Sequence, residues 1–165
     1  MMNRILPGSE LNFLLGDAAR LWRQAVERAL SDADLGLTGS EVRTLTYVAR
    51  FEGTRQRDLA GLMGIEPMTL SAMLEVLEKR GLVDRRIDPR DRRARCIHLT
   101  AEATAVFERI APASRLVQDH ALDGFSMEQR RAFESALRVV RGNLMRHVCS
   151  AGRIGSAAGN RPEAA

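Results

Sequence analysis

The chain lacks the features that mark several large protein classes. Its two cysteines, Cys96 and Cys149, are too few for a disulfide framework and do not have the spacing of metal ligands. Its three histidines lie far apart and form no HxxxH pair, which argues against catalytic zinc. No apolar run approaches the roughly 18 residues of a membrane-spanning helix, and residues 1–20 lack the cleavage pattern of an export signal. We therefore expect a cytoplasmic protein without a metal or a membrane partner.

Catalytic motifs are also missing from the sequence. We find no nucleophile with a matched base, no glycine-rich phosphate loop and no paired carboxylates in a setting that suggests a pocket. An enzymatic activity and a cofactor are therefore not expected.

The charge of the chain is concentrated in one segment. The 165 residues suffice for about one domain, and their net charge is +4. Residues 79–95 alone hold eight cations and three anions, a net charge of +5. Such a concentration fits contact with a polyanion, although a solvated charged turn is an equal alternative.

Hydrophobic spacing predicts a series of helices in the first half of the chain. Leucines and alanines recur every three to four residues over 10–33, which predicts a long amphipathic helix. Thr38 and Glu41 have the spacing of a capping box and open a second helix. Thr54 is expected to cap a short third helix that Gly64 closes. A fourth helix begins at Pro67 and stops at Gly81, and its buried stripe contains Leu70, Leu74 and Leu77.

The pattern changes after the fourth helix. Residues 83–87 and 95–99 are short enough for strands, and the turn residues 88–91 between them predict a β-hairpin with a basic tip. A further helix follows Thr100, and Pro112 should kink or divide it. Ser126 and Gln129 form a second capping-box spacing before the last helix, whose stripe contains Phe133, Leu137, Val140 and Leu144. Residues 151–165 show no periodicity and are expected to be a disordered tail.

These elements predict a mainly α fold with a small β-hairpin wing. The order of short helix, tight turn, second helix and hairpin over 38–100 is that of a winged helix-turn-helix. The flanking segments 10–33 and 101–148 have long apolar stripes that the small remaining protein cannot cover, so we expect them to be dimerisation helices. The alternative is that they fold back on their own domain.

The sequence resembles the MarR family of bacterial transcriptional regulators, and its SlyA-like branch most closely. The most specific element is the ordered set GIEPMTLS…LEKRGLV…DRR…LT, and the likeness spans about residues 10–148. The resemblance implies a homodimer that binds a pseudo-palindromic operator in double-stranded DNA. In such modules the second helix enters the major groove and the wing reaches the neighbouring backbone or minor groove.

The resemblance also suggests which residues meet DNA. Family members use an Asp-x-Arg pair in the wing to orient an arginine into the minor groove, and Asp91 and Arg93 match it; Asp91 could also be a simple turn residue. Ala72 stands where SlyA-like proteins often have an arginine that bonds guanine, so few side chains here can read bases bidentately. We expect the wings to supply much of the affinity, which makes binding steeply dependent on salt. The expected contacts are Thr54, Arg55 and Arg57 before and in the third helix, with Arg57 alternatively a solvated charge; Met68, Thr69, Ser71, Ala72 and Lys79 on the fourth; and Arg90, Asp91, Arg92 and Arg93 on the wing.

The sequence indicates the signal that such a regulator senses less clearly than it indicates the DNA contacts. MarR-like dimers commonly bind small aromatic or anionic compounds between the dimerisation helices and the winged part. Arg20, Trp22 and Arg43 could form that pocket, with cations for a carboxylate and a ring for stacking. Equally, Trp22 could be core and both arginines surface. Peroxide-sensing relatives carry their reactive cysteine near the N-terminal helix, and no cysteine precedes Cys96 in this sequence. Thiol sensing is therefore disfavoured, and we treat both cysteines as structural.

The sequence thus predicts a DNA-binding transcriptional regulator, by default a repressor that a ligand releases. Because the exposed face of the fourth helix is poor in base-reading side chains, the rival is a ligand-binding or protein-interaction dimer that has lost specific DNA binding.

Overall fold

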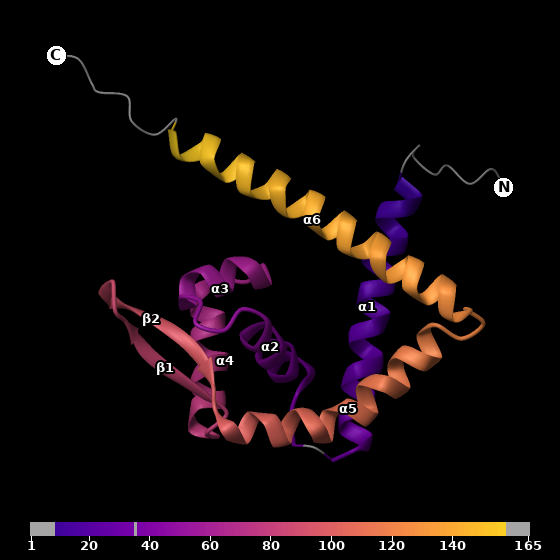
Figure 1. Cartoon of the computed structure of the whole chain (residues 1–165), viewed down its shortest axis with the longest axis horizontal. Helices are drawn as coiled ribbons and strands as arrows, with labels where there is room; N and C mark the ends of the chain where they lie inside the picture. The colour runs from indigo at the N-terminus through magenta and orange to yellow at the C-terminus, as the bar shows by residue number, and fades with distance from the viewer. Residues whose placement is uncertain (1–8, 35, 158–165) are drawn as a thin grey trace. The chain divides into compact units, whose positions relative to one another are not determined.

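The structure is a computed structural model that describes residues 9–34 and 36–157. These residues form two compact units, the first ending at Ala121 and the second beginning at Leu122. The first unit contains α1 (Ser9–Asp32), α2 (Gly39–Arg50), α3 (Gln56–Met63), α4 (Pro67–Lys79), β1 (Val83–Asp88), β2 (Asp91–Leu99) and α5 (Ala101–Ala121); the second contains α6 (Met127–Ala157). Figure 1 labels these elements in chain order. The mainly helical fold with one hairpin is the predicted one.

Helix boundaries in the first unit follow from local chemistry. Thr38 and Glu41 form the predicted capping box, in which each side chain accepts a hydrogen bond from the other's backbone N–H. Gly81, at a φ of +69°, ends α4 as predicted, and the N–H of Leu82 donates to the Leu77 carbonyl oxygen. One cap is wrong: the N-cap of α3 is Arg55 rather than Thr54, and its side chain does not cap the helix.

The winged part has a core that extends beyond residues 38–100. Its centre consists of leucines of α2, α3 and α4 that are fully buried. Leu30 near the end of α1 and Ile110 of α5 belong to the same cluster. α1 also packs along α5 within this unit (Figure 1). The winged part is therefore closed by its flanking helices rather than by its own residues alone.

The boundaries of α5 and α6 agree only in part with the predicted ones. α5 contains Pro112 and is not divided by it, although its ribbon bends along its length (Figure 1). In the second unit, Ser126 and Gln129 form the predicted capping box at the start of α6. α6 continues to Ala157, so residues 151–157, expected in a disordered tail, are helical because propagation adds one hydrogen bond for each residue fixed and no proline intervenes. The rest of that tail lies outside the described residues.

Candidate nucleic-acid interface

α3 and α4 form the predicted helix-turn-helix. The chain bends by 109° between them, within the range of about 90–120° that is typical of the motif. Gly64 makes the turn at a φ of +65°, a conformation that favours glycine. Pro67 then opens α4 at a position where a missing N–H is tolerated.

No single helix in the described part of the chain is long and apolar enough to span a membrane.

α4 buries one face and exposes the other. Leu70, Leu74 and Leu77 are 0% exposed and hold the helix against the core. The opposite face carries the five predicted DNA contacts of this helix: Met68, Thr69, Ala72 and Lys79 are exposed, and Ser71 is half-buried. Glu75 and Val76 are exposed on the same face. Lys79 is not free, because its ammonium nitrogen lies 2.8 Å from a carboxylate oxygen of Glu75.

The wing is a two-stranded antiparallel hairpin whose strands run to the turn. β2 begins at Asp91, four residues earlier than the sequence predicted, because Asp91 pairs with Asp88 across the turn and the strand continues to Arg95, which pairs with Ile87. A register shift between Ile87 and Asp88 bends the hairpin near its tip.

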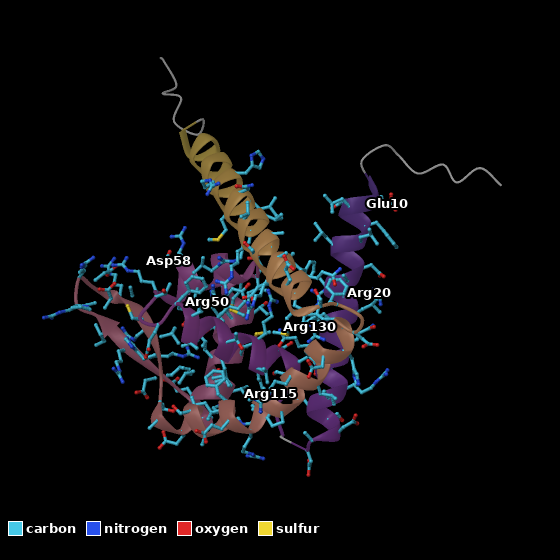
Figure 2. All side chains as sticks on the ribbon, turned by 45° about the vertical axis from the view of Figure 1, so that its right-hand side comes forward. Glu10, Arg20, Arg50, Asp58, Arg115 and Arg130 are labelled. Carbon is cyan, nitrogen blue, oxygen red and sulfur yellow. The ribbon has the colours of Figure 1, made fainter. Side chains whose placement is uncertain are left out.

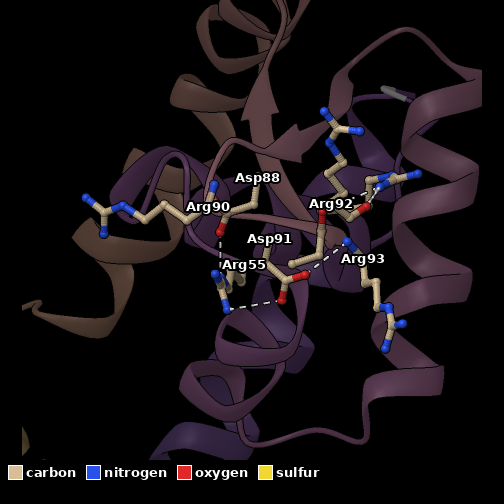
Figure 3. A network of polar contacts seen from close by, with 8 residues as sticks. Arg55, Asp88, Arg90, Asp91, Arg92 and Arg93 are labelled. Carbon is tan, nitrogen blue, oxygen red and sulfur yellow. Dashed lines mark hydrogen bonds and ion pairs between the residues drawn. The ribbon is translucent and has the colours of Figure 1, made fainter.

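Two aspartates organise the tip. A carboxylate oxygen of Asp88 accepts a hydrogen bond from the backbone N–H of Arg90 at 2.8 Å. Asp91 likewise accepts from the backbone N–H of Arg93 at 3.0 Å. The Asp-x-Arg pair therefore acts here on the main chain of Arg93 rather than on its guanidinium (Figure 3).

Most cations of the basic segment are engaged within the protein. Five of the eight between residues 79 and 95 have partners: Lys79 with Glu75, Arg80 with Glu41, Arg85 with Glu78 and the Ser71 carbonyl, Arg86 with Asp84, and Arg95 with the Arg92 carbonyl. In the described structure the side chains of the other three, Arg90, Arg92 and Arg93, have no such partner, and all three are exposed at the tip of the wing. Figure 3 shows Arg90 and Arg93 extending away from the carboxylates. The free positive charge is thus concentrated at the tip.

The predicted DNA contacts before and in α3, namely Thr54, Arg55 and Arg57, have different surroundings. Arg57 is exposed on α3, as a phosphate contact requires. The main chain of Thr54 is bound to the wing, since its carbonyl accepts a hydrogen bond from the N–H of Ile97 at 3.1 Å. Arg55 points into the wing, where Nε lies 2.6 Å from Asp88 Oδ2. The backbone N–H of Arg90 and the Arg55 guanidinium hold the pKa of the Asp88 carboxyl below its ordinary value.

A pocket of about 330 Å³ lies in the first unit between α1, α2 and α5. Two of the three residues predicted for a ligand pocket, Trp22 and Arg43, line it. The third, Arg20, does not: its guanidinium pairs with Asp17 on the exposed surface of α1 (Figure 2). The full lining consists of Trp22, Arg23, Val26, Glu27, Gly39, Ser40, Val42, Arg43, Thr46, Tyr47 and Ser114.

Sequence reasoning missed Arg23, which follows Arg20 by one helical turn, and Tyr47. Since i and i+4 share a helix face, the pairing of Arg43 with Tyr47 was available from spacing. The Arg43 guanidinium lies 5.5 Å from the Tyr47 ring centroid, and its Nη2 donates to the Met63 carbonyl oxygen at 2.6 Å. Arg43 therefore joins the pocket to the last turn of α3.

Cys96 has the surroundings of a structural thiol. It is half-buried on β2, and burial, with a further contribution from the charge of Asp88, raises its pKa above the ordinary value. A reactive sensor thiol needs the opposite shift. The side chain of Cys149 lies outside the described residues.

Comparison with known proteins agrees with this architecture. Residues 35–94 match the sequence model of the MarR family. The crystal structure of MarR is similar to this chain with a TM-score of 0.76 and 25% identity, covering 91% of this chain and 99% of that one. A MarR-family transcriptional regulator of Silicibacter pomeroyi matches with a TM-score of 0.70 and 25% identity over 85% and 96% of the two chains.

A third similar structure contains nucleic acid. It is a MarR family protein of Mycobacterium tuberculosis in complex with DNA, with a TM-score of 0.64 and 27% identity over 79% of this chain and 96% of that one. Together the matches show that this chain has the winged helix-turn-helix fold of MarR-family transcriptional regulators.

Proposed function

We propose that the chain is a homodimeric transcriptional regulator that binds a pseudo-palindromic site in duplex DNA. The observation that carries this proposal is the placement of three unpaired guanidinium groups at the tip of the wing, on a unit that also exposes one face of α4. A narrow minor groove has an enhanced negative potential that attracts guanidinium. The likeness to a family member solved with DNA supports the same role, which involves no enzymatic step. Cytoplasmic location and membership of the SlyA-like branch remain predictions.

The test begins with duplexes that the wild-type protein selects from a randomised pool, followed by fluorescence anisotropy. Arg93→Ala should weaken binding at least about tenfold. It should also lower the slope of log affinity against log salt by about two for a dimer, since each lost contact contributes about one. Arg86→Ala is the matched control, because Arg86 lies on the same hairpin but pairs with Asp84. The role is rejected if no duplex is enriched, which is the result that the rival without specific DNA binding requires.

Dimerisation is proposed from exposed apolar faces. In α1, Leu11, Phe13 and Leu14 are exposed, and Leu14 is 54% exposed. In α6, Phe133, Leu137, Val140 and Leu144 are exposed on one stripe. Contiguous apolar surface of this kind marks interaction sites, and a second copy supplies the same surface by two-fold symmetry. Sedimentation equilibrium separates a dimer from a monomer with folded-back helices.

Repression relieved by a small aromatic anion is the mode of regulation that we propose. The pocket offers two rings, Trp22 and Tyr47, and two cations, Arg23 and Arg43, against one carboxylate, Glu27. The carboxylate of such a ligand would draw the Arg43 guanidinium toward the pocket. It would then compete with the hydrogen bond that Arg43 donates to the Met63 carbonyl at the end of α3. Trp22 is the only tryptophan of the chain, so quenching of its fluorescence by benzoate reports occupancy directly.

Arg43→Met should abolish the quenching and the accompanying loss of DNA affinity. Arg20→Gln, outside the pocket, should change neither. Quenching that persists in Arg43→Met would place the ligand elsewhere.

A further inference from the structure

One guanidinium connects the start of α3 to the tip of the wing. Arg55 is the N-cap of α3, and its backbone carbonyl accepts the first helical hydrogen bond from Leu59. Its side chain leaves the helix and reaches both tip carboxylates (Figure 3). Nε lies 2.6 Å from Asp88 Oδ2, and Nη1 lies 3.8 Å from Asp91 Oδ2.

Each of those carboxylates also holds the main chain of an arginine. The second oxygen of Asp88 accepts from the N–H of Arg90, and the second oxygen of Asp91 accepts from the N–H of Arg93. Arg55 therefore contacts the two groups that set the backbone of two of the three free arginines. The Asp88 residue is 6% exposed, although it lies beside a turn. A carboxylate so withdrawn from water is costly unless it is paired and hydrogen-bonded.

The base of the wing is fixed by other contacts. Gly53 and Thr54 exchange backbone hydrogen bonds with Ile97, at 2.9 and 3.1 Å, and Arg55 forms a β-bridge with Cys96. Beyond these residues the hairpin has only two strands, and Ile87 near its tip is 58% exposed. A two-stranded hairpin without further packing is marginally stable. Arg85, opposite Ile97 on β1, also ties the base of the hairpin to α4 through Glu78 and the Ser71 carbonyl. Beyond these positions, the described contacts that tie the tip to the helix-turn-helix are those of Arg55.

We propose that Arg55 is a positioning residue that, through Asp88 and Asp91, fixes the direction of the wing tip relative to α3, and that it is not itself a phosphate contact. The proposal rests on the proposed DNA-binding function. It replaces the role that the sequence suggested for Arg55, because that guanidinium is engaged on the protein.

The sign of a charge effect distinguishes positioning from simple electrostatics. DNA repels carboxylates, so removing one from the wing should strengthen binding if the carboxylate acts only as a charge. Removing a carboxylate that positions the tip should weaken binding instead. Asp88→Asn keeps the size of the side chain and an oxygen for the N–H of Arg90, while it abolishes the ion pair with Arg55.

The experiment compares Asp88→Asn with Asp84→Asn, which removes the same charge from an exposed position on the same strand. Binding is measured by anisotropy on a duplex selected by the wild-type protein. We expect Asp84→Asn to bind as tightly as wild type or more tightly, and Asp88→Asn to bind at least about fivefold more weakly. Asp88→Asn that binds as well as Asp84→Asn would overturn the proposal.

A mutant cycle separates positioning from direct contact. If Arg55 acts through the tip, the loss caused by Arg55→Ala should largely disappear in the Arg93→Ala background, since coupled residues are non-additive. If Arg55 touches phosphate, the two losses should add, and Arg55→Ala should lower the salt slope by about two for a dimer. The additive outcome contradicts the proposal.

Amide hydrogen exchange tests the same contact without DNA. In Asp88→Asn the amides of Arg90 and Arg93 should exchange at least about tenfold faster than in wild type, while that of Ile97, held at the base, should not change. Unchanged exchange at the tip would refute the positioning role. If the wild-type protein selects no duplex, the proposed function fails, and the exchange measurement still decides whether Arg55 fixes the tip.

Discussion

α4 and α6 have the same hydrophobic spacing and opposite environments. Leu70, Leu74 and Leu77 of α4 are 0% exposed, whereas Leu144 in the stripe of α6 is 57% exposed. The same contrast occurs within α1, where Leu30 is 2% exposed and Leu14 is 54% exposed. Periodicity shows that a helix has an apolar face but does not show what covers that face. A single chain buries the apolar core of the winged part, whereas it leaves the stripe of α6 and the first half of α1 exposed.

The largest expected effect tests the closed side of this comparison. Leu74→Ala should lower the free energy of unfolding by about 2–5 kcal/mol, because it opens a cavity in a packed core. Val76→Ala, at an exposed position of the same helix, should change it by no more than about 0.5 kcal/mol. Urea denaturation at fixed protein concentration measures both. Equal losses would mean that α4 does not bury the face described here.

The next effect tests the open side. The double variant Leu137→Glu/Leu144→Glu should raise the dimer dissociation constant at least about 100-fold, equivalent to about 2.7 kcal/mol, because carboxylates would have to be buried in an apolar interface. Helix content measured by circular dichroism should stay unchanged. Sedimentation equilibrium gives the constant.

Val139→Glu is the control for that variant. Val139 is also exposed but lies off the stripe, so its change should leave the dimer intact. If the wild-type protein is already a monomer, the proposed dimer is wrong.

A smaller effect locates the boundary between the two regions. Ile110 of α5 belongs to the winged core and is 4% exposed. Ile110→Val should therefore cost about 0.5–1.5 kcal/mol of unfolding free energy. Leu116→Val, at an exposed position of the same helix, should cost less than about 0.5 kcal/mol. If the two variants are indistinguishable, α5 does not close the winged part.

The fold could be predicted from the sequence because its signals are local. Capping boxes, the Gly64 turn and leucine spacing each act within a few residues, and the structure confirms them. Boundaries failed where no local stop existed, as at the end of α6, or where strand pairing extended into a polar stretch, as at Asp91.

The candidate site could be predicted only in part. The three tip arginines follow from composition and turn residues. The partner of Arg55 is 33 residues away, at Asp88, and no local pattern joins them. The pocket likewise depends on which turn of α1 faces α2, so a choice between Arg20 and Arg23 needed the tertiary structure. Charge counts predict a basic segment, but pairing decides which of its cations are free.

The smallest expected effect concerns two carboxylates of β1, the buried Asp88 and the exposed Asp84. The pKa of Asp88 is lowered in the folded state by the N–H of Arg90 and by Arg55, so its charged form stabilises the fold. That contribution is complete above the unfolded-state value of about 4 and is lost as the pH falls through the lower folded-state value. The difference in unfolding free energy between wild type and Asp88→Asn should therefore be constant from about pH 7 to 5 and shrink below about pH 4. Urea titrations across this range measure it, with Asp84→Asn as the control for removing a carboxylate from the same strand. A difference that persists undiminished at the lowest pH would show that Asp88 acts by packing rather than by its charge.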